Sequence, residues 1–249
     1  MITATPRLLA AVLVLLTAAP VLSRADGPTP YPDPKDDAAW PGKGPIRVFP
    51  WMTDNRNYYW NRRANDQGTI VFVGDSLTGN WKLGDMKAAL SGYHVSNRGI
   101  GGDVTRGVLF RLKEDVLDLN PQAMVLLIGT NDLSAKSPPQ VIADNIALII
   151  EQAREFKNDL PIVLCLLPPR ASDAAPIDPE KLTELNARLT ALGENRENLV
   201  VLDLYSALAT PEGNPDPQYF GKDQLHLASG GYKKWAEILK PAFEKLGLN

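Results

Sequence analysis

VFVGDSLTGNW (residues 71–81) places Ser76 in a polar turn directly behind a run of apolar residues. Gly, Asp and Ser are common turn formers, so this turn can simply end a buried strand. The same turn can instead present the Ser76 hydroxyl as a nucleophile. The rest of the chain has to decide between these two interpretations.

The residues that follow alternate between short apolar runs and helical patterns. The apolar runs are continuous, as expected for strands that are buried on both faces. Five such strands separated by helices predict an α/β fold, a three-layer α/β/α sandwich around a five-stranded parallel sheet. A flavodoxin-like strand order of 2-1-3-4-5 would make the first three strands neighbours. The predicted strands are 70–73, a weaker one at 94–97, then 124–128, 162–167 and 199–202.

Polar residues follow each of the first three strands. Ser76 follows the first, NRGIGGDVT (97–105) follows the second, and GTND (129–132) follows the third. Ligands of open α/β sheets bind at the carboxyl ends of the strands, so these loops should meet above the sheet. A serine hydroxyl together with oxyanion donors is what acyl transfer requires. We expect the donors to be the backbone N–H groups of Ser76 and Gly102 and the side-chain amide of Asn131.

A serine nucleophile also needs a base, and the chain has two histidines. His94 precedes the second strand and therefore lies at the wrong end of the sheet. His226 lies in GKDQLHLASGGY just before the last helix, three residues after Asp223. The sequence thus predicts a catalytic triad of Ser76, His226 and Asp223 in their usual roles.

Each of these motifs has another interpretation when it is taken alone. Asp-x-x-His can cap a helix or bind a metal, but a metal would want further His or carboxylate ligands, and suitably spaced ones are not found. We therefore predict no metal site. GIGGDV is not a dinucleotide fingerprint, because Val104 occupies the place of its last glycine. GDSLT lacks the second glycine of the G-x-S-x-G nucleophile elbow.

Together, and in this order, the motifs resemble the SGNH, or GDSL-type, hydrolases over residues 51–247. Within that family, the stretch from GIGGDV to GTND and the HLASGGY motif look most like the platelet-activating-factor acetylhydrolase Ib catalytic subunits. The resemblance implies a flavodoxin-like fold, no cofactor, and hydrolysis of small, often acetyl, esters. Gln224 departs from the family pattern, because it stands where Gly is common, and it could narrow the pocket beside His226.

The ends of the chain differ in character from its middle. Residues 1–25 combine Arg7, an apolar run and the small residues Ser23 and Ala25, which predicts a signal peptide and an exported, periplasmic or secreted, protein. A short membrane anchor is the alternative. Residues 26–50 are rich in Pro and Gly and predict an arm or linker, and residues 51–249 predict the hydrolase domain. The formal net charge of −3 and the lack of a basic run argue against a nucleic-acid partner.

The substrate is the least determined part of the prediction. The loops expected to rim the site, 168–178 and 210–221, are polar, and Arg170, Tyr219 and Phe220 are available there for contacts. They favour a small-molecule or glycan ester over a lysophospholipid or phospholipid acetyl ester, although they can be plain surface loops. A catalytically silent binding protein is the alternative from another class. The aromatic residues 51 and 58–60 are expected to pack against the domain, with sugar stacking as the alternative.

Overall fold

The structure is a computed structural model that describes Met1 and residues 26–248. The signal-peptide prediction falls on residues 1–25 and so lies, apart from Met1, outside the described residues. The strands are β1 (Ile70–Gly74), β2 (Val95–Gly99), β3 (Ala123–Leu127), β4 (Ile162–Cys165) and β5 (Leu199–Leu202). The longer helices are α1 (Pro50–Arg62), α3 (Leu83–Ala89), α4 (Thr105–Asp115), α6 (Pro139–Phe156), α7 (Pro179–Gly193) and α9 (Ser229–Lys245). The short ones are α2 (Ser76–Gly79), α5 (Thr130–Ser134), α8 (Leu204–Leu208), and the 3-10 turns η1 (Asp37–Ala39) and η2 (Leu117–Leu119).

The five strands form one parallel sheet in the order β2-β1-β3-β4-β5. The predicted fold class and strand order are confirmed. Strand β2 begins at Val95 and runs to Gly99, two residues beyond the predicted end. The sequence VSNRG hides this extension because Arg98 is charged, but its buried guanidinium pairs with Asp66 and donates to the Asp115 carbonyl.

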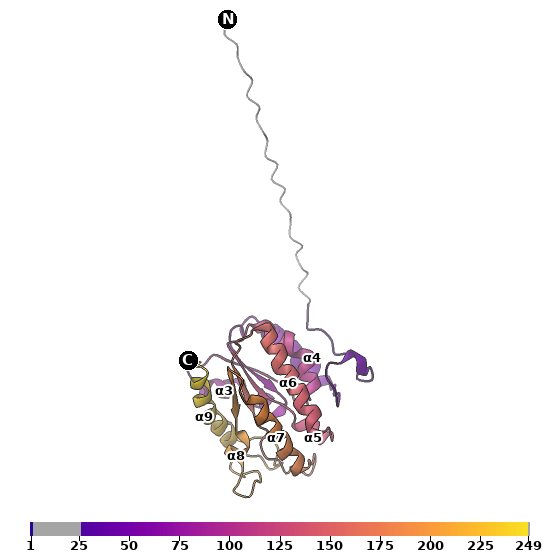
Figure 1. Cartoon of the computed structure of the whole chain (residues 1–249), viewed down its shortest axis with the longest axis vertical. Coiled ribbons are helices and arrows are strands. Elements are labelled where there is room, and N and C mark those ends of the chain that lie inside the picture. Colours follow the sequence, from indigo (N-terminus) through magenta and orange to yellow (C-terminus); the bar gives the residue numbers. More distant parts are fainter. Residues whose placement is uncertain (2–25, 249) are drawn as a thin grey trace.

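Successive residues of β1 face opposite layers, which explains its continuous apolar run. Val71 and Val73 join one core cluster together with residues of α4, α6 and α7. Ile70 and Phe72 join a second cluster together with residues of α3 and α9. Figure 1 shows these two helical layers on either side of the sheet. The layers hold the carboxyl ends of β1, β2 and β3 side by side.

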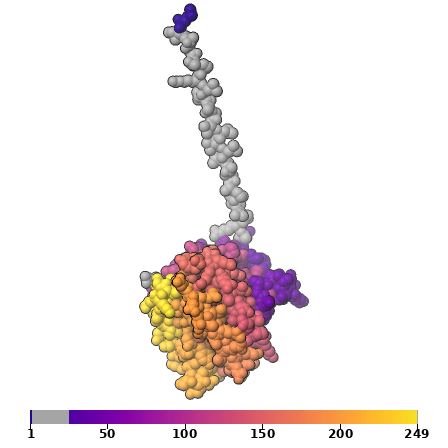
Figure 2. Space-filling model, viewed as in Figure 1, coloured from indigo at the N-terminus to yellow at the C-terminus, as the bar shows by residue number. Residues whose placement is uncertain are grey.

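Residues 26–50 lie as an extended arm against α1 and α4 and form the indigo part of the rounded surface in Figure 2. The rings of Tyr31 and Trp40 pack on Phe110 of α4, with ring centroids 5.3 and 5.4 Å away. Thr29 donates hydrogen bonds to the Glu114 carboxylate from both its N–H and its hydroxyl. The arm is therefore tied to the domain along its length.

Arg106 of α4 is the main anchor of the arm. Its buried guanidinium donates to the carbonyls of Trp40, Pro41 and Gly44 and forms an ion pair with Asp37. One side chain thus satisfies several backbone acceptors of a segment that has no sheet partner. This matters for the site because the arm ends at Pro50, next to the loops that carry the predicted functional residues.

Arg106→Leu should lower the free energy of unfolding by about 2–4 kcal/mol, because buried acceptors lose a charged donor. Urea unfolding at constant m-value measures the effect. Arg188→Leu is the control, since Arg188 is an exposed arginine of α7 that pairs with Glu184, and it should cost less than about 1 kcal/mol. Equal losses in the two variants would contradict an anchoring role for Arg106.

Candidate active site

Ser76 is the first residue of α2 and lies directly beyond the end of β1. Asp75 caps this short helix, because its carboxylate accepts the Leu77 N–H at 2.9 Å. The helix rests on the end of β2: a Cβ on Gly99 would lie 2.3 Å from the backbone nitrogen of Gly79. The turn therefore ends the strand and also holds Ser76 in one position.

The structure brings the three predicted triad residues into one hydrogen-bonded chain. The Ser76 hydroxyl lies 2.9 Å from Nε2 of His226, and Nδ1 of His226 lies 2.6 Å from Oδ2 of Asp223. The other carboxylate oxygen of Asp223 accepts the N–H groups of Leu225 and His226. A tight loop, closed by the bond from the Gly221 N–H to the His226 carbonyl, thus fixes the acid and the imidazole together.

The predicted triad residues are open to solvent. The side chains of His226 and Asp223 are 36% and 47% exposed. Partial burial raises the pKa of Asp223, but the hydrogen bonds from His226 and from the backbone outweigh it and hold that pKa below its ordinary value. Asp223 is therefore ionised at neutral pH and can orient the imidazole and stabilise its protonated form.

Two of the three predicted oxyanion donors, Gly102 and Asn131, lie on segments that are hydrogen-bonded to each other. Gly102 has a φ of +84°, a left-handed conformation that favours glycine, and it carries the backbone between β2 and α4. The Asn131 side chain donates one N–H to the carbonyl of Asp103 at 2.9 Å. The neighbouring Gly101 faces Ser76, since a Cβ added there would lie 3.8 Å from the Ser76 Cβ.

A buried ion pair joins this loop, residues 99–103, to the end of β1. Nε of Arg111 lies 2.8 Å from the Asp103 carboxylate, and the same guanidinium donates to the carbonyl of Gly74 at 3.1 Å. Burial alone would lower the pKa of Arg111, but Asp103 and Asp115 outweigh it, so the pKa lies above its ordinary value and the charge is kept. Sequence reasoning missed this pair, because its two members stand eight residues apart and share no motif.

Gly107 makes room for the ion pair. A Cβ on Gly107 would lie only 1.9 Å from the Asp103 carboxylate. A second buried carboxylate, Asp132 of α5, accepts both the hydroxyl and the N–H of Thr105 at the start of α4. Polar contacts thus join the loop after β2 both to the end of β1 and to the loop after β3.

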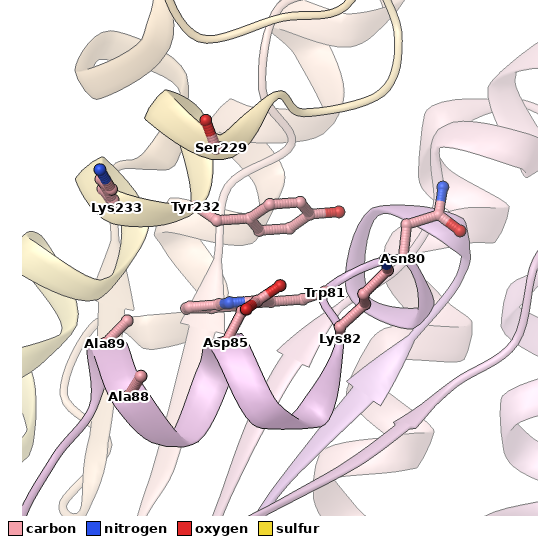
Figure 3. Close-up of a pocket in the computed structure, with 9 residues that line it drawn as sticks. All are labelled: Asn80, Trp81, Lys82, Asp85, Ala88, Ala89, Ser229, Tyr232 and Lys233. Carbon is pink, nitrogen blue, oxygen red and sulfur yellow. The ribbon is translucent and has the colours of Figure 1, made fainter.

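A groove of about 560 Å³ opens beside α2, between α3 and α9. In Figure 3 the Tyr232 ring lies over the Trp81 ring, with Asp85 in front and Ser229 and Lys233 of α9 nearby. The Tyr232 hydroxyl donates to the Leu77 carbonyl at 3.1 Å. The inner wall of the groove therefore braces the helix that begins with Ser76.

Two of the residues expected to be available at the rim are not. Arg170 is buried and donates to the carbonyl and the hydroxyl of Thr130, and Phe220 is buried in the core that faces α9. Both brace the loops around the site. Tyr219 is half-buried against the same core.

Gln224 adopts a backbone conformation that favours glycine. Its φ of +50° is left-handed, and its carbonyl accepts the N–H of Ala171 from the neighbouring loop. His94 lies where the sequence placed it, just ahead of β2 and away from the triad.

The aromatic residues at the start of the domain, expected to pack against it, do so only in part. Tyr59 is buried and donates to the Gly99 carbonyl at 2.5 Å, as a packing residue should. Trp51 and Tyr58 are instead 48% and 54% exposed. The packing prediction was wrong for these two side chains.

Met1 and residues 26–248 contain neither a candidate metal-binding cluster nor a candidate membrane-spanning helix. Within that part of the chain, no group of three or more His, Cys, Asp or Glu side chains is arranged to hold a metal ion. The described helices include none with the length and apolar character needed to cross a membrane.

Comparison with known proteins identifies the family. Residues 72–234 match the model of the GDSL-like lipase/acylhydrolase family. The chain belongs to this family. It is 28% identical over 196 residues to platelet-activating factor acetylhydrolase IB subunit alpha2 of Homo sapiens, covering 78% of this chain and 82% of that protein.

Solved structures extend the likeness. A GDSL-like lipase from Bacteroides thetaiotaomicron superposes with a TM-score of 0.63 at 27% identity, covering 76% of this acylhydrolase and 96% of the lipase. A catalytic mutant of an acetylxylan esterase from Geobacillus stearothermophilus shares the fold, with a TM-score of 0.56 at 18% identity over 74% and 96% of the two chains. This protein is accordingly a GDSL-type ester hydrolase.

Asp75→Asn should flatten the dependence of the acylhydrolase's stability on pH. Burial raises the pKa of Asp75 to about 7, against the partial opposition of the Leu77 N–H. The protonated carboxyl therefore stabilises the fold at pH 4, and this contribution is lost as the pH rises through about 7. Asparagine keeps an acceptor for the Leu77 N–H but does not titrate.

Urea midpoints at pH 5 and pH 8 measure the Asp75 effect. Asp85→Asn, at an exposed position of α3, is the matched control and should behave as the unmodified protein does. If the urea midpoint changes between pH 5 and pH 8 by the same amount in Asp75→Asn as in the unmodified protein, Asp75 is ionised throughout and the prediction is wrong.

Proposed function

We propose that this acylhydrolase removes short acyl groups, above all acetyl, from a polar alcohol such as an acetylated carbohydrate. The hydrogen-bonded chain from Ser76 through His226 to Asp223 is the observation that carries the proposal. The 2.9 Å and 2.6 Å separations are those that a nucleophile, its base and an orienting acid need. A silent binding protein has no use for this arrangement.

In the proposed reaction, Nε2 of His226 accepts the hydroxyl proton while Ser76 Oγ bonds to the ester carbonyl carbon. The resulting oxyanion accepts hydrogen bonds from the N–H groups of Ser76 and Gly102 and from the Asn131 amide, whose second N–H is not used by Asp103. His226 then gives the proton to the departing alcohol. A water molecule repeats the sequence on the acyl-enzyme and releases the carboxylic acid, so the chemistry needs no cofactor.

Two observations favour a short acyl group. The exposed triad side chains suit an ester that reaches the site from water. One relative is a platelet-activating factor acetylhydrolase, which points to acetyl as the acyl group. We also propose that residues 1–25 direct export, which would bring the enzyme to glycans outside the cytoplasm.

The same relative favours a second candidate function. If the alcohol resembles that of platelet-activating factor, the enzyme would be a phospholipid acetylhydrolase or a lysophospholipase. The two candidates share the triad and differ in the alcohol, so the choice between them rests on substrates and leaves the mechanism unchanged.

Ser76→Ala should lower kcat for p-nitrophenyl acetate by roughly 10⁴-fold or more, because the covalent step is lost. The thermal transition should stay nearly unchanged, since only one oxygen atom of a half-buried side chain is removed. Ser206→Ala, at an exposed position of α8, is the control and should keep full activity. Activity retained in Ser76→Ala, or a fluorophosphonate label mapped to another residue, would refute the proposed nucleophile.

Acyl-chain length tests the substrate class. The kcat/KM should fall from acetyl through butyryl to octanoyl p-nitrophenyl esters, because His226 and Asp223 are 36% and 47% exposed and a long acyl chain beside them would stay largely in water. Acetate release from acetylated oligosaccharides should likewise exceed fatty-acid release from lysophospholipids. Faster turnover of octanoyl esters and lysophospholipids would select the lysophospholipase candidate.

A further inference from the structure

The end of the arm places two aromatic rings beside the loop that carries Gly102. The rings of Phe49 and Trp51 are stacked, with centroids 4.5 Å apart and planes within 14°. The edge of the Phe49 ring lies against Gly102, since a Cβ there would be 3.2 Å from Phe49 Cε2. We call this pair, Phe49 and Trp51, the aromatic platform.

The platform is continuous with the nucleophile. The Trp51 indole N–H donates to the Gly101 carbonyl at 2.8 Å. Gly101 in turn faces Ser76, with 3.8 Å between the Ser76 Cβ and a Cβ built on the glycine. Only Gly101 therefore separates the indole from the Ser76 side chain. One substrate molecule can contact both the Trp51 ring and the Ser76 hydroxyl.

Trp51 is held in place and yet open to solvent. Phe49 covers one of its faces and the Gly101 carbonyl fixes its N–H edge, but 48% of the residue remains exposed. The open area therefore includes the face turned away from Phe49. A fixed aromatic face binds ligands at low cost in conformational entropy, because no side chain has to be ordered.

The surroundings of the platform favour a polar ligand. Thr53 and Asp54, in the same turn of α1, are exposed, and the Asn55 side chain donates to the Trp51 carbonyl. A sugar ring has apolar C–H faces and a rim of hydroxyls, so it can cover the indole while its hydroxyls stay in water or contact these side chains. A long acyl chain on this ring would contact the indole on one side and water on the other.

We propose that the aromatic platform is a carbohydrate subsite, in which Trp51 stacks on a sugar ring of the acetylated oligosaccharide that Ser76 deacylates. This inference rests on the proposed function and names the part of the chain that recognises its substrate. The platform belongs to the arm and to the first turn of α1, so Arg106 supports it through the arm.

Steady-state kinetics on acetylated xylo-oligosaccharides and on p-nitrophenyl acetate test the platform. The ratio of interest is kcat/KM for the oligosaccharide divided by kcat/KM for p-nitrophenyl acetate. Trp51→Ala should lower this ratio about tenfold, mainly by raising KM for the oligosaccharide. Trp51→Phe should keep that ratio near its original value, because phenylalanine retains a flat ring but cannot bond to Gly101. Tyr58→Ala, at an exposed ring on the same helix, is the matched control and should leave the ratio unchanged.

The phenylalanine variant separates stacking from bracing. A Trp51 that merely holds Gly101 in place would make the Phe and Ala variants equally poor, and on both substrates. That result would overturn the proposal, as would an unchanged ratio in Trp51→Ala.

Calorimetric titration separates failure of the platform from failure of the proposed function. Ser76→Ala protein should bind acetylated xylo-oligosaccharides, and Ser76→Ala/Trp51→Ala protein should bind them about tenfold more weakly. Equal affinities, or no binding to the single variant, would overturn the platform even if Ser76 proves to be the nucleophile. Weaker binding by the double variant would support the platform even if Ser76→Ala retained activity.

Discussion

Arg111 joins the two backbone segments on which the site is built. Its guanidinium contacts the Asp103 carboxylate and the Gly74 carbonyl, so it ties the loop after β2 to the end of β1. Ser76 follows Gly74 by two residues, and Gly102 precedes Asp103 by one. The position of the proposed nucleophile relative to the proposed oxyanion donor is thus set by a charge buried beneath both.

Such a cluster is stable only while its members remain paired. Below the loop, Arg98 pairs with Asp66 and Arg56 pairs with Asp115, and all four side chains are almost fully buried. Buried ion pairs contribute little net free energy, because desolvation offsets their attraction, but a lone buried charge is costly. The cluster therefore disfavours small displacements of the loop more than it stabilises the fold, which is what preorganised catalysis requires.

The sequence predicted the fold and the proposed triad because both rest on local patterns. Apolar runs mark the strands, and GDSL and DQLH place Ser76, Asp223 and His226 after strand ends that a parallel sheet brings together. The same reasoning missed Arg111 and gave Arg170 and Phe220 the wrong role. Burial of an arginine depends on partners far along the chain, and nothing in a polar, Pro-rich loop shows which of its side chains turns inward. Trp51 was misjudged because an aromatic residue in a helix is normally a packing residue.

The aromatic platform and the triad occupy different parts of the chain. The match to the family begins at residue 72, so Phe49 and Trp51 lie outside it, whereas Ser76, Gly102, Asn131, Asp223 and His226 all lie inside. The arm contacts the helices of the sandwich and contributes no strand to the described sheet. It can therefore change without altering any strand pairing. In evolution, a chain of this design can therefore exchange the segment in which we propose that the alcohol is recognised. The loops that carry the proposed triad would stay the same. Replacing residues 26–51 while keeping the sheet and its helices is accordingly a natural route to esterases with new preferences.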